Sequence, residues 1–239
     1  RLYQLRFREG ANGDVVHEAR EIDPALLHDH DAGYNAFVKQ EAARAQKASP
    51  LASSRAMAAE VARDDGSVVD LLVAYTAGAR IGAGGTAAIV SEIELAVAET
   101  NLTYQNSGVV HRLRLLKTLE VDYTETGASS TDLSRLRSKT DRHADEVHAY
   151  RSAYGADIVS LIVERMDDAC GIGYLMTNVS TSFAVSAFNV VARRCATSIY
   201  AFAHEVGHNM GLRHDTFQDS GTTPFADAHG YVELAARYR

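Results

Sequence analysis

The chain has 239 residues, of which 46% are hydrophobic and 23% charged, and its formal net charge is −7. This composition is ordinary for a soluble globular protein, and it excludes collagen-like, coiled-coil and wholly disordered chains. The net negative charge gives the chain no general reason to bind nucleic acid or an anionic membrane surface. We also expect no membrane span, because every apolar run is shorter than the roughly 18 residues that a spanning helix needs.

The first segment of the chain, residues 1–66, differs in texture from the rest. Residues 2–8 alternate between apolar and polar side chains, which is typical of a strand. Asn12-Gly13 then predicts a turn, and Val15-Val16 favours a return strand. Residues 41–62 are mostly Ala with scattered charges and lack large apolar side chains. They predict either a weak helix or a linker.

From Ser67 onward, predicted strands alternate with predicted helices. In chain order these elements are a strand over 68–75, a glycine-rich turn over 78–85, a helix from Ile89 to Tyr104, a strand over 109–121, a polar helix over 131–150, strands over 158–163, 171–175 and 183–191, and a helix over 198–210 with Thr197 as its N-cap. Such an alternation of strands and helices favours an α/β arrangement.

One segment near the C-terminus carries a pattern typical of a metal site. It contains His204-Glu205-Val206-Gly207-His208, within the last predicted helix. Residues four apart lie on the same face of a helix, so His204 and His208 point the same way and form half of a tetrahedral zinc site. Glu205 lies about 100° round the helix from His204, beside the metal, where it can hold an attacking water.

Gly211 and His214 complete this pattern. A continued helix would carry His214 roughly 120° away from the metal face, so the chain must turn. Gly211 stands where a residue with positive φ would end the helix. The spacing is explained if His214 returns to the same metal as a third ligand. Three histidines leave a fourth position open for water, which distinguishes a catalytic from a structural zinc.

These residues carry a resemblance to a known family. The segment CATSIYAFAHEVGHNMGLRHD, residues 195–215, ends in a motif that resembles the extended zinc motif of the metzincin metallopeptidases, with Asp after the third His as in their reprolysin-like branch. The segments VDLLVAYT (69–76), CGIGYL (170–175) and HGY (229–231) are similar to those of bacterial peptidyl-Asp metalloendopeptidases. The resemblance covers residues 67–239.

The resemblance implies a fold and an activity. The fold is α/β (α+β): a metzincin-type catalytic domain over residues 67–239, with a twisted mixed sheet, an edge strand lining the cleft and an active-site helix carrying the HExxH motif. The activity is that of a zinc-dependent endopeptidase, in which a glutamate takes a proton from a zinc-bound water. The substrates are then proteins or peptides, with a preference for bonds on the amino side of Asp.

The resemblance also assigns residues to the site. These are His204, His208 and His214 as ligands of one catalytic Zn²⁺, Glu205 as the general base, and Gly211 and Asp215 as residues of the turn that supports the metal from below. A methionine-containing turn is expected after the third histidine. None of the four methionines, at positions 57, 166, 176 and 210, lies there. We therefore expect the C-terminal subdomain to be truncated in this chain.

The expected edge strand runs from Gly171 through Gly173 and Tyr174 to Leu175. In the resembling enzymes the substrate lies along this strand as an added antiparallel strand. Glycines leave the backbone open to such pairing, although an ordinary strand end with loop glycines reads the same way. Selectivity for an acidic residue needs a basic group, for which the candidates are Arg193, Arg194 and Arg213, with Arg194 preferred.

The two cysteines, Cys170 and Cys195, are compatible with one disulfide or with two buried thiols. The disulfide is expected if the protein is secreted, as the resemblance implies for a bacterial enzyme. Residues 1–66 would then be the remnant of a pro-region and its linker. We expect an extracellular monomer.

Two other interpretations remain open. In a gluzincin a downstream glutamate is the third ligand, and Glu233 has a suitable position, but Gly211 and His214 are then unexplained. Alternatively, the chain is a catalytically silent zinc-bearing binding domain or a latent zymogen fragment. Glu205 argues against silence, because zinc binding alone does not need that carboxylate.

Overall fold

The computed structural model describes residues 2–9, 15–22, 68–197 and 199–231. The first two of these stretches are strands, β1 (Leu2–Glu9) and β2 (Val15–Ile22), which pair antiparallel with Leu2 opposite Ile22. The predicted N-terminal strand and its return strand are confirmed, the latter longer than its two valines indicated. The helix or linker predicted over 41–62 lies outside the described residues.

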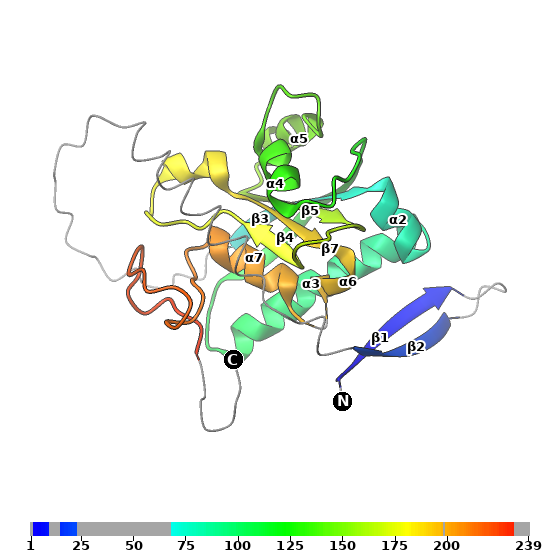
Figure 1. Cartoon of the computed structure of the whole chain (residues 1–239), viewed down its shortest axis with the longest axis horizontal. Helices are drawn as coiled ribbons and strands as arrows, with labels where there is room; N and C mark the ends of the chain where they lie inside the picture. The colour runs from blue at the N-terminus through cyan, green and yellow to red at the C-terminus, as the bar shows by residue number, and fades with distance from the viewer. Residues whose placement is uncertain (1, 10–14, 23–67, 198, 232–239) are drawn as a thin grey trace.

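A five-stranded sheet forms the centre of the molecule (Figure 1). Its strands are β3 (Val68–Thr76), β4 (Arg112–Val121), β5 (Ile158–Val163), β6 (Gly171–Gly173) and β7 (Phe188–Ala192). Their order across the sheet is β4-β3-β5-β7-β6. The first four are parallel, and β6 pairs antiparallel with β7 at the edge. The predicted mixed sheet with an edge strand near residue 171 is confirmed.

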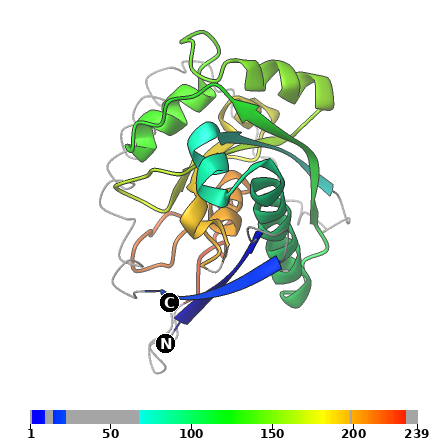
Figure 2. The same ribbon diagram turned by 90° about the vertical axis from the view of Figure 1, so that its right-hand side faces the viewer.

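Helices cover both faces of this sheet. They are α2 (Ala77–Ala83), α3 (Thr86–Asn106), α4 (Ser129–Arg137), α5 (Glu146–Tyr154), α6 (Arg193–Ala196) and α7 (Ala201–Asn209), with a 3₁₀ helix η2 (Thr181–Ser186). Figures 1 and 2 show α4 and α5 on one face and α3 and α7 on the other. The chain moves to one side of β3 to form β4 and to the other side to form β5. Since crossovers between parallel strands are right-handed, this reversal places the two sets of helices on opposite faces.

The core lies between the sheet and these helices. All six residues of β5 and all five of β7 are buried, as expected for strands covered on both faces. The helix predicted from Ile89 to Tyr104 is confirmed as part of α3, whose buried residues are Ile89, Ile93, Ala96, Val97, Thr100 and Tyr104. Each large apolar side chain removed from water in this way stabilises the fold by about 1.5–3 kcal/mol.

The glycine-rich turn predicted over 78–85 is wrong, because most of this segment is helix α2. The hydroxyl of Thr76 caps the helix by accepting a hydrogen bond from the amide of Ala79 at 2.9 Å. Gly82 serves packing, since a Cβ there would collide with the carboxylate of Glu164. The turn is confined to Gly84 and Gly85, whose φ angles of +100° and +133° favour glycine.

The single helix predicted over 131–150 is two helices, α4 and α5, separated by a polar loop. Within the loop, Asp141 accepts a hydrogen bond from the amide of His143, and Asp145 accepts one from the amide of Arg142. Such local side-chain bonds satisfy backbone groups without a helix. The positive φ angles of Arg142 and Ala144, +69° and +55°, complete the break.

The remaining predictions for the sheet and the last helix differ at their boundaries. The strand predicted over 183–191 contains η2 before β7 begins, and the edge strand ends at Gly173. Thr197 does not cap the last helix. It follows the short helix α6, and the chain then turns at Tyr200, whose φ is +59°, before α7 begins at Ala201.

Within the described residues no single helix is both long and apolar enough to cross a membrane. Helices α2 and α3 meet that test only when taken together, and they are bent by 92° at their junction.

Candidate active site

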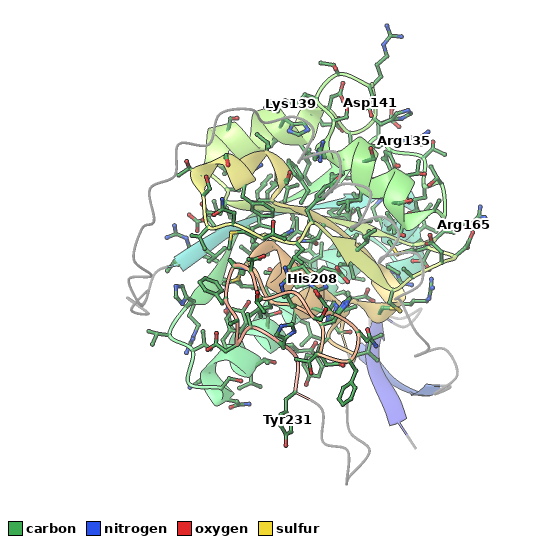
Figure 3. All side chains as sticks on the ribbon, turned by 60° about the vertical axis from the view of Figure 1, so that its left-hand side comes forward. Arg135, Lys139, Asp141, Arg165, His208 and Tyr231 are labelled. Atoms are coloured by element: carbon green, nitrogen blue, oxygen red, sulfur yellow. A yellow bond between two sulfur atoms is a disulfide. The ribbon has the colours of Figure 1, made fainter. Side chains whose placement is uncertain are left out.

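Helix α7 places two imidazoles side by side below the sheet. The side chains of His204 and His208 lie one turn apart, and their Nε2 atoms are 2.9 Å apart. Figure 3 shows His208 near the middle of the molecule, where α7 passes beneath the sheet. His208 is buried and His204 exposed, so the pair is open to solvent on one side only.

His214 joins this pair because the chain reverses after α7. Gly211 has a φ of +94°, which confirms the turn predicted there. A Cβ on Gly211 would lie 2.7 Å from Cγ of Pro224, so the position excludes a side chain on steric grounds as well. The reversal brings Nε2 of His214 to 3.1 Å from Nε2 of both His204 and His208.

The geometry of the three histidines suits one metal ion. In a tetrahedral zinc site with Zn–N bonds of about 2.0–2.1 Å, neighbouring nitrogens are about 3.3 Å apart, close to the separations of 2.9–3.1 Å found here. Three Nε2 atoms converging on one point cannot all be satisfied by hydrogen bonds to each other, whereas a shared cation satisfies all of them. The group therefore has the donor set of a metal site.

The surroundings of His208 favour the form that binds metal. Its Nδ1 lies 2.8 Å from the carbonyl oxygen of Leu212, so Nδ1 carries the proton and Nε2 is left with its lone pair. Burial lowers the pKa of His208 well below the usual range, and the nearby His204 and His214 lower it further. The imidazole is therefore neutral, as a ligand must be.

Glu205 lies between α7 and the edge strand β6. Its side chain is 5% exposed, and burial raises the pKa of its carboxyl group well above the usual range. Its Oε2 is buried and has no hydrogen-bond partner among the residues that the structure describes. A carboxylate withdrawn from solvent is a stronger proton acceptor than an exposed one, which is what a general base needs.

The glycines of β6 have a steric role that sequence reasoning missed. A Cβ on Gly171 would lie 2.6 Å from Cγ of Glu205, and one on Gly173 would lie 2.9 Å from the carbonyl oxygen of Glu205. The bare backbone of β6 therefore makes room for α7 and its carboxylate. The other predicted residues of this segment follow directly, with Tyr174 buried and Leu175 partly buried.

Among the residues that the structure describes, β6 has a strand partner on one side only. β6 is the last strand in the order and pairs with β7 through Gly171–Val191 and Gly173–Asn189. A peptide could pair with its other edge by main-chain hydrogen bonds.

The segment after His214 is held by hydrogen bonds within a turn. Asp215 is buried, and its Oδ1 accepts a hydrogen bond from the amide of Phe217 at 2.9 Å. The ring of His229 lies against the turn, with Nδ1 2.8 Å from the carbonyl oxygen of His214 and Nε2 2.8 Å from that of Gly221. His229 belongs to the HGY segment of the resemblance, and its ring packs here against the turn that follows His214. Figure 3 shows the segment continuing to Tyr231 at the lower end of the molecule.

The three candidate arginines differ in their partners. Arg193 is buried and pairs with the carboxylates of Glu92 and Glu164. Arg213 pairs with Asp219 at 2.6 Å. Arg194 is exposed, and its Nη2 donates a hydrogen bond to the carbonyl oxygen of Met166. Arg193 and Arg213 are therefore ion-paired with carboxylates, whereas Arg194 donates to a backbone carbonyl.

A fourth arginine, Arg137, was not indicated by the sequence. It lies at the end of α4, and its Cζ is 5.0 Å from the centre of the Tyr174 ring, next to the edge strand.

Cys170 and Cys195 are joined by a disulfide, with their Cα atoms 5.6 Å apart. The bond links the residue before β6 to helix α6, which precedes α7. The amide of Ala192 also donates a hydrogen bond to the carbonyl oxygen of Cys170 at 2.8 Å. The edge strand and the segment leading to α7 are thereby held together.

Glu233, the alternative third ligand, lies outside the described residues.

Known proteins share this sequence and fold. A reprolysin-type model described as metallo-peptidase family M12 matches residues 65–234. A peptidyl-Asp metalloendopeptidase of Xanthomonas campestris pv. campestris is 34% identical over 232 residues, which cover 97% of this chain and 51% of that protein. One of Stenotrophomonas maltophilia (strain K279a) is 35% identical over 217 residues, 90% of this chain and 48% of that protein. One of Pseudomonas aeruginosa is 36% identical over 192 residues, 72% and 30% respectively.

The chain therefore spans about half the length of the first two relatives and less of the third. Among solved structures, one described as "Structure of a chaperone-substrate complex" aligns with a TM-score of 0.53 and 24% identity, over 70% of this chain and 29% of that chain. This likeness concerns the fold alone. The match over residues 65–234, with relatives about one-third identical, settles the family. The chain belongs to metallo-peptidase family M12, the reprolysin-like metallopeptidases.

Proposed function

We propose that the protein is a zinc-dependent endopeptidase. The observation that carries this proposal is the convergence of three imidazole nitrogens, 2.9–3.1 Å apart, beside a buried carboxylate and a free strand edge. The three imidazoles are the donors of a catalytic zinc site, the carboxylate of Glu205 has the properties of a base, and the edge of β6 can receive a peptide backbone.

His204, His208 and His214 would hold the zinc. When bound, zinc polarises the scissile carbonyl and lowers the pKa of the attacking water. Glu205 accepts the proton of that water, because its carboxyl group is desolvated and has a raised pKa. It then donates the proton to the leaving amine, so that hydrolysis needs no covalent enzyme intermediate.

The substrate backbone would pair with the free edge of β6, from Gly171 and Gly173 to Tyr174 and Leu175. Pairing of this kind recognises any extended peptide, since main-chain groups make the hydrogen bonds. It also places the bound chain alongside Glu205, which packs beneath these glycines.

For selectivity we propose a preference for bonds on the amino side of Asp. Its support is the printed name of the relatives, peptidyl-Asp metalloendopeptidase. Of the three candidate arginines we favour Arg194, because it is exposed and donates to a backbone carbonyl, whereas Arg193 and Arg213 are ion-paired with acidic side chains. Arg137 is a further candidate, since it lies on Tyr174 beside the edge strand.

We also propose that residues 1–66 are a pro-region and that the protein is a secreted monomer. The disulfide between Cys170 and Cys195 supports secretion, because such bonds persist in oxidising compartments. Cleavage between Asp64 and Ser67 is then expected to raise the peptidase activity. Equal activity before and after cleavage would rule out this role for the segment.

The proposed function is tested with a peptide mixture and the Glu205→Gln variant. The parent protein, loaded with zinc, should produce new peptide termini that the variant does not produce, and sequencing should find Asp just after the cut. The variant should bind the same amount of zinc, which shows that its site is intact. If the parent binds zinc and cuts nothing, even after cleavage between Asp64 and Ser67, the protein is a zinc-bearing binding domain and the proposal fails.

A further inference from the structure

Asn209, the residue after the second histidine of the motif, makes three buried hydrogen bonds. It is the last residue of α7 and is 4% exposed. Its Nδ2 donates to the carbonyl oxygens of Tyr174, at 2.8 Å, and Phe188, at 3.1 Å. Its Oδ1 accepts a hydrogen bond from Nδ2 of Asn189 at 2.9 Å. A single amide therefore contacts the two strands that lie above α7.

These contacts all fall where the edge strand ends. Tyr174 directly follows β6, and Phe188 is the first residue of β7. The amide of Tyr174 donates to the carbonyl oxygen of Phe188 at 3.2 Å, so the two strands are still paired at this point. One residue pair further, the amide of Met176 donates to the carbonyl oxygen of His208 at 3.0 Å. The metal helix and the edge strand are thus joined directly.

Side-chain packing alone does not fix how α7 lies along β6. The strand faces the helix with Gly171 and Gly173, which have no side chains to interlock with those of α7. On this face the strand has no side chains to interlock with the helix, so polar contacts such as those of Asn209 and the Met176–His208 hydrogen bond hold α7 in place along the strand. Glu205 and Asn209 are four residues apart and lie on the same side of α7. The hydrogen bonds of the Asn209 amide therefore fix where α7, and with it Glu205, lies along β6.

We infer that Asn209 is a positioning residue that sets the register between the metal helix and the strand that receives the substrate. This inference rests on the proposed function. A peptide paired with β6 is positioned by that strand, whereas the metal and the base are positioned by α7. The scissile carbonyl meets the metal site only if the two elements are in register, and Asn209 is the side chain that ties them.

The inference predicts an effect that depends on substrate length. An extended peptide of about eight residues uses many main-chain contacts with β6, and a short peptide of about three residues uses few. Loss of register should therefore cost the long peptide more than the short one. Loss of the two hydrogen bonds that Asn209 donates corresponds to roughly a fivefold to 150-fold change.

The test compares kcat/KM for these two peptides in zinc-loaded Asn209→Asp. Aspartate has nearly the same shape, but its oxygen would face the carbonyl oxygens of Tyr174 and Phe188 and could not donate to them. We expect zinc binding to be retained and the long-to-short ratio of kcat/KM to fall about fivefold or more, through a lower kcat for the long peptide. Asn209→Ser, which is smaller and neutral, should shift the ratio in the same direction and serves if the aspartate variant does not fold.

Val147→Ala provides the control for stability. Val147 is fully buried on α5, whose main contacts with the sheet are with β3 and β4. Its truncation should destabilise the protein and leave the long-to-short ratio unchanged. An unchanged ratio in both Asn209 variants would overturn the inference. If the parent hydrolyses neither peptide, the proposed function has failed instead, so the two failures are distinguishable.

Discussion

Replacing Gly171 with alanine tests the contact between the edge strand and the carboxylate of Glu205, the proposed general base. The added Cβ would lie 2.6 Å from Cγ and 2.7 Å from Oε1 of Glu205, about 0.8 Å inside the 3.4 Å at which ordinary contact begins. Cγ lies near the base of the side chain, so rotation of the carboxylate alone cannot relieve the overlap. Either Glu205 changes rotamer or β6 and α7 move apart.

The expected cost follows from this overlap. Overpacking of a well-packed interior costs about 1–3 kcal/mol, and we expect Gly171→Ala to lower the free energy of unfolding by that amount. A displacement of about 1 Å at a reacting group can reduce the rate about 100-fold. We therefore expect kcat to fall by about 10- to 100-fold while one zinc remains bound, because the three atoms nearest the added Cβ all belong to Glu205 and none to a histidine.

A double-mutant cycle separates this explanation from a general effect of alanine on β6. Denaturant unfolding is measured for the parent, Gly171→Ala, Glu205→Ala and the double variant. Glu205→Ala removes Cγ and with it the overlap, so the substitution at Gly171 should cost close to nothing in that background. The coupling energy should equal the 1–3 kcal/mol lost in the parent. The same loss in both backgrounds would refute the steric reasoning.

Three further predictions concern the metal, the sheet and selectivity. His214→Ala should weaken zinc binding by more than about 100-fold, because loss of a residue that only hydrogen-bonds to a metal ligand already costs up to that much. Competition with a chelator measures this, and equal zinc affinity of both proteins would contradict the prediction. Removal of zinc by a chelator should also lower the melting temperature of the parent. The hydrogen bonds from Arg114 hold the pKa of Asp70 below its usual value of 3.8. This stabilisation is present above the usual pKa and is lost as the pH falls through the lowered pKa of the folded state. Asp70→Asn should therefore lower the free energy of unfolding by up to about 1 kcal/mol at pH 7. The difference in unfolding free energy between parent and variant should disappear as the pH drops below 3.8, which denaturant unfolding at pH 7 and below pH 3.8 would measure. Arg194→Ala should reduce the preference for Asp in sequenced cleavage products, and an unchanged preference would exclude that residue.

The metal site could be predicted from sequence because its geometry is local. The spacing of His204 and His208 is fixed by the helix, and the return of His214 requires a turn that Gly211 permits. These relations span only a few residues. The rings converge in the structure with the φ of Gly211 at +94°, as that reasoning requires.

The environment of Glu205 could not be predicted in this way. Its burial depends on Gly171 and Gly173, which are more than 30 residues earlier in the chain and meet α7 only in the folded sheet. The sequence indicates only substrate pairing for these glycines, because pairing is the effect visible in one strand alone. It does not indicate Asn209 either, since the partners of that side chain, Tyr174 and Phe188, are 35 and 21 residues away in the chain.

The errors in secondary structure arise where polar side chains or unusual backbone angles override periodicity. Asp141 and Asp145 bind nearby amides and break a segment that reads as one helix. Tyr200 adopts a φ of +59°, which delays the start of α7 beyond the predicted cap at Thr197. A non-glycine residue with positive φ gives no signal in apolar spacing.

The most direct test of the account is to restore zinc to the metal-free protein in measured steps while following peptide hydrolysis. We predict no hydrolysis without metal, a rate that rises in proportion to the zinc added, and a plateau at one zinc per chain. Glu205→Gln should take up the same single zinc and remain inactive. Hydrolysis by the metal-free protein, or full activity of Glu205→Gln, would contradict the assignment of the three histidines and Glu205 to catalysis.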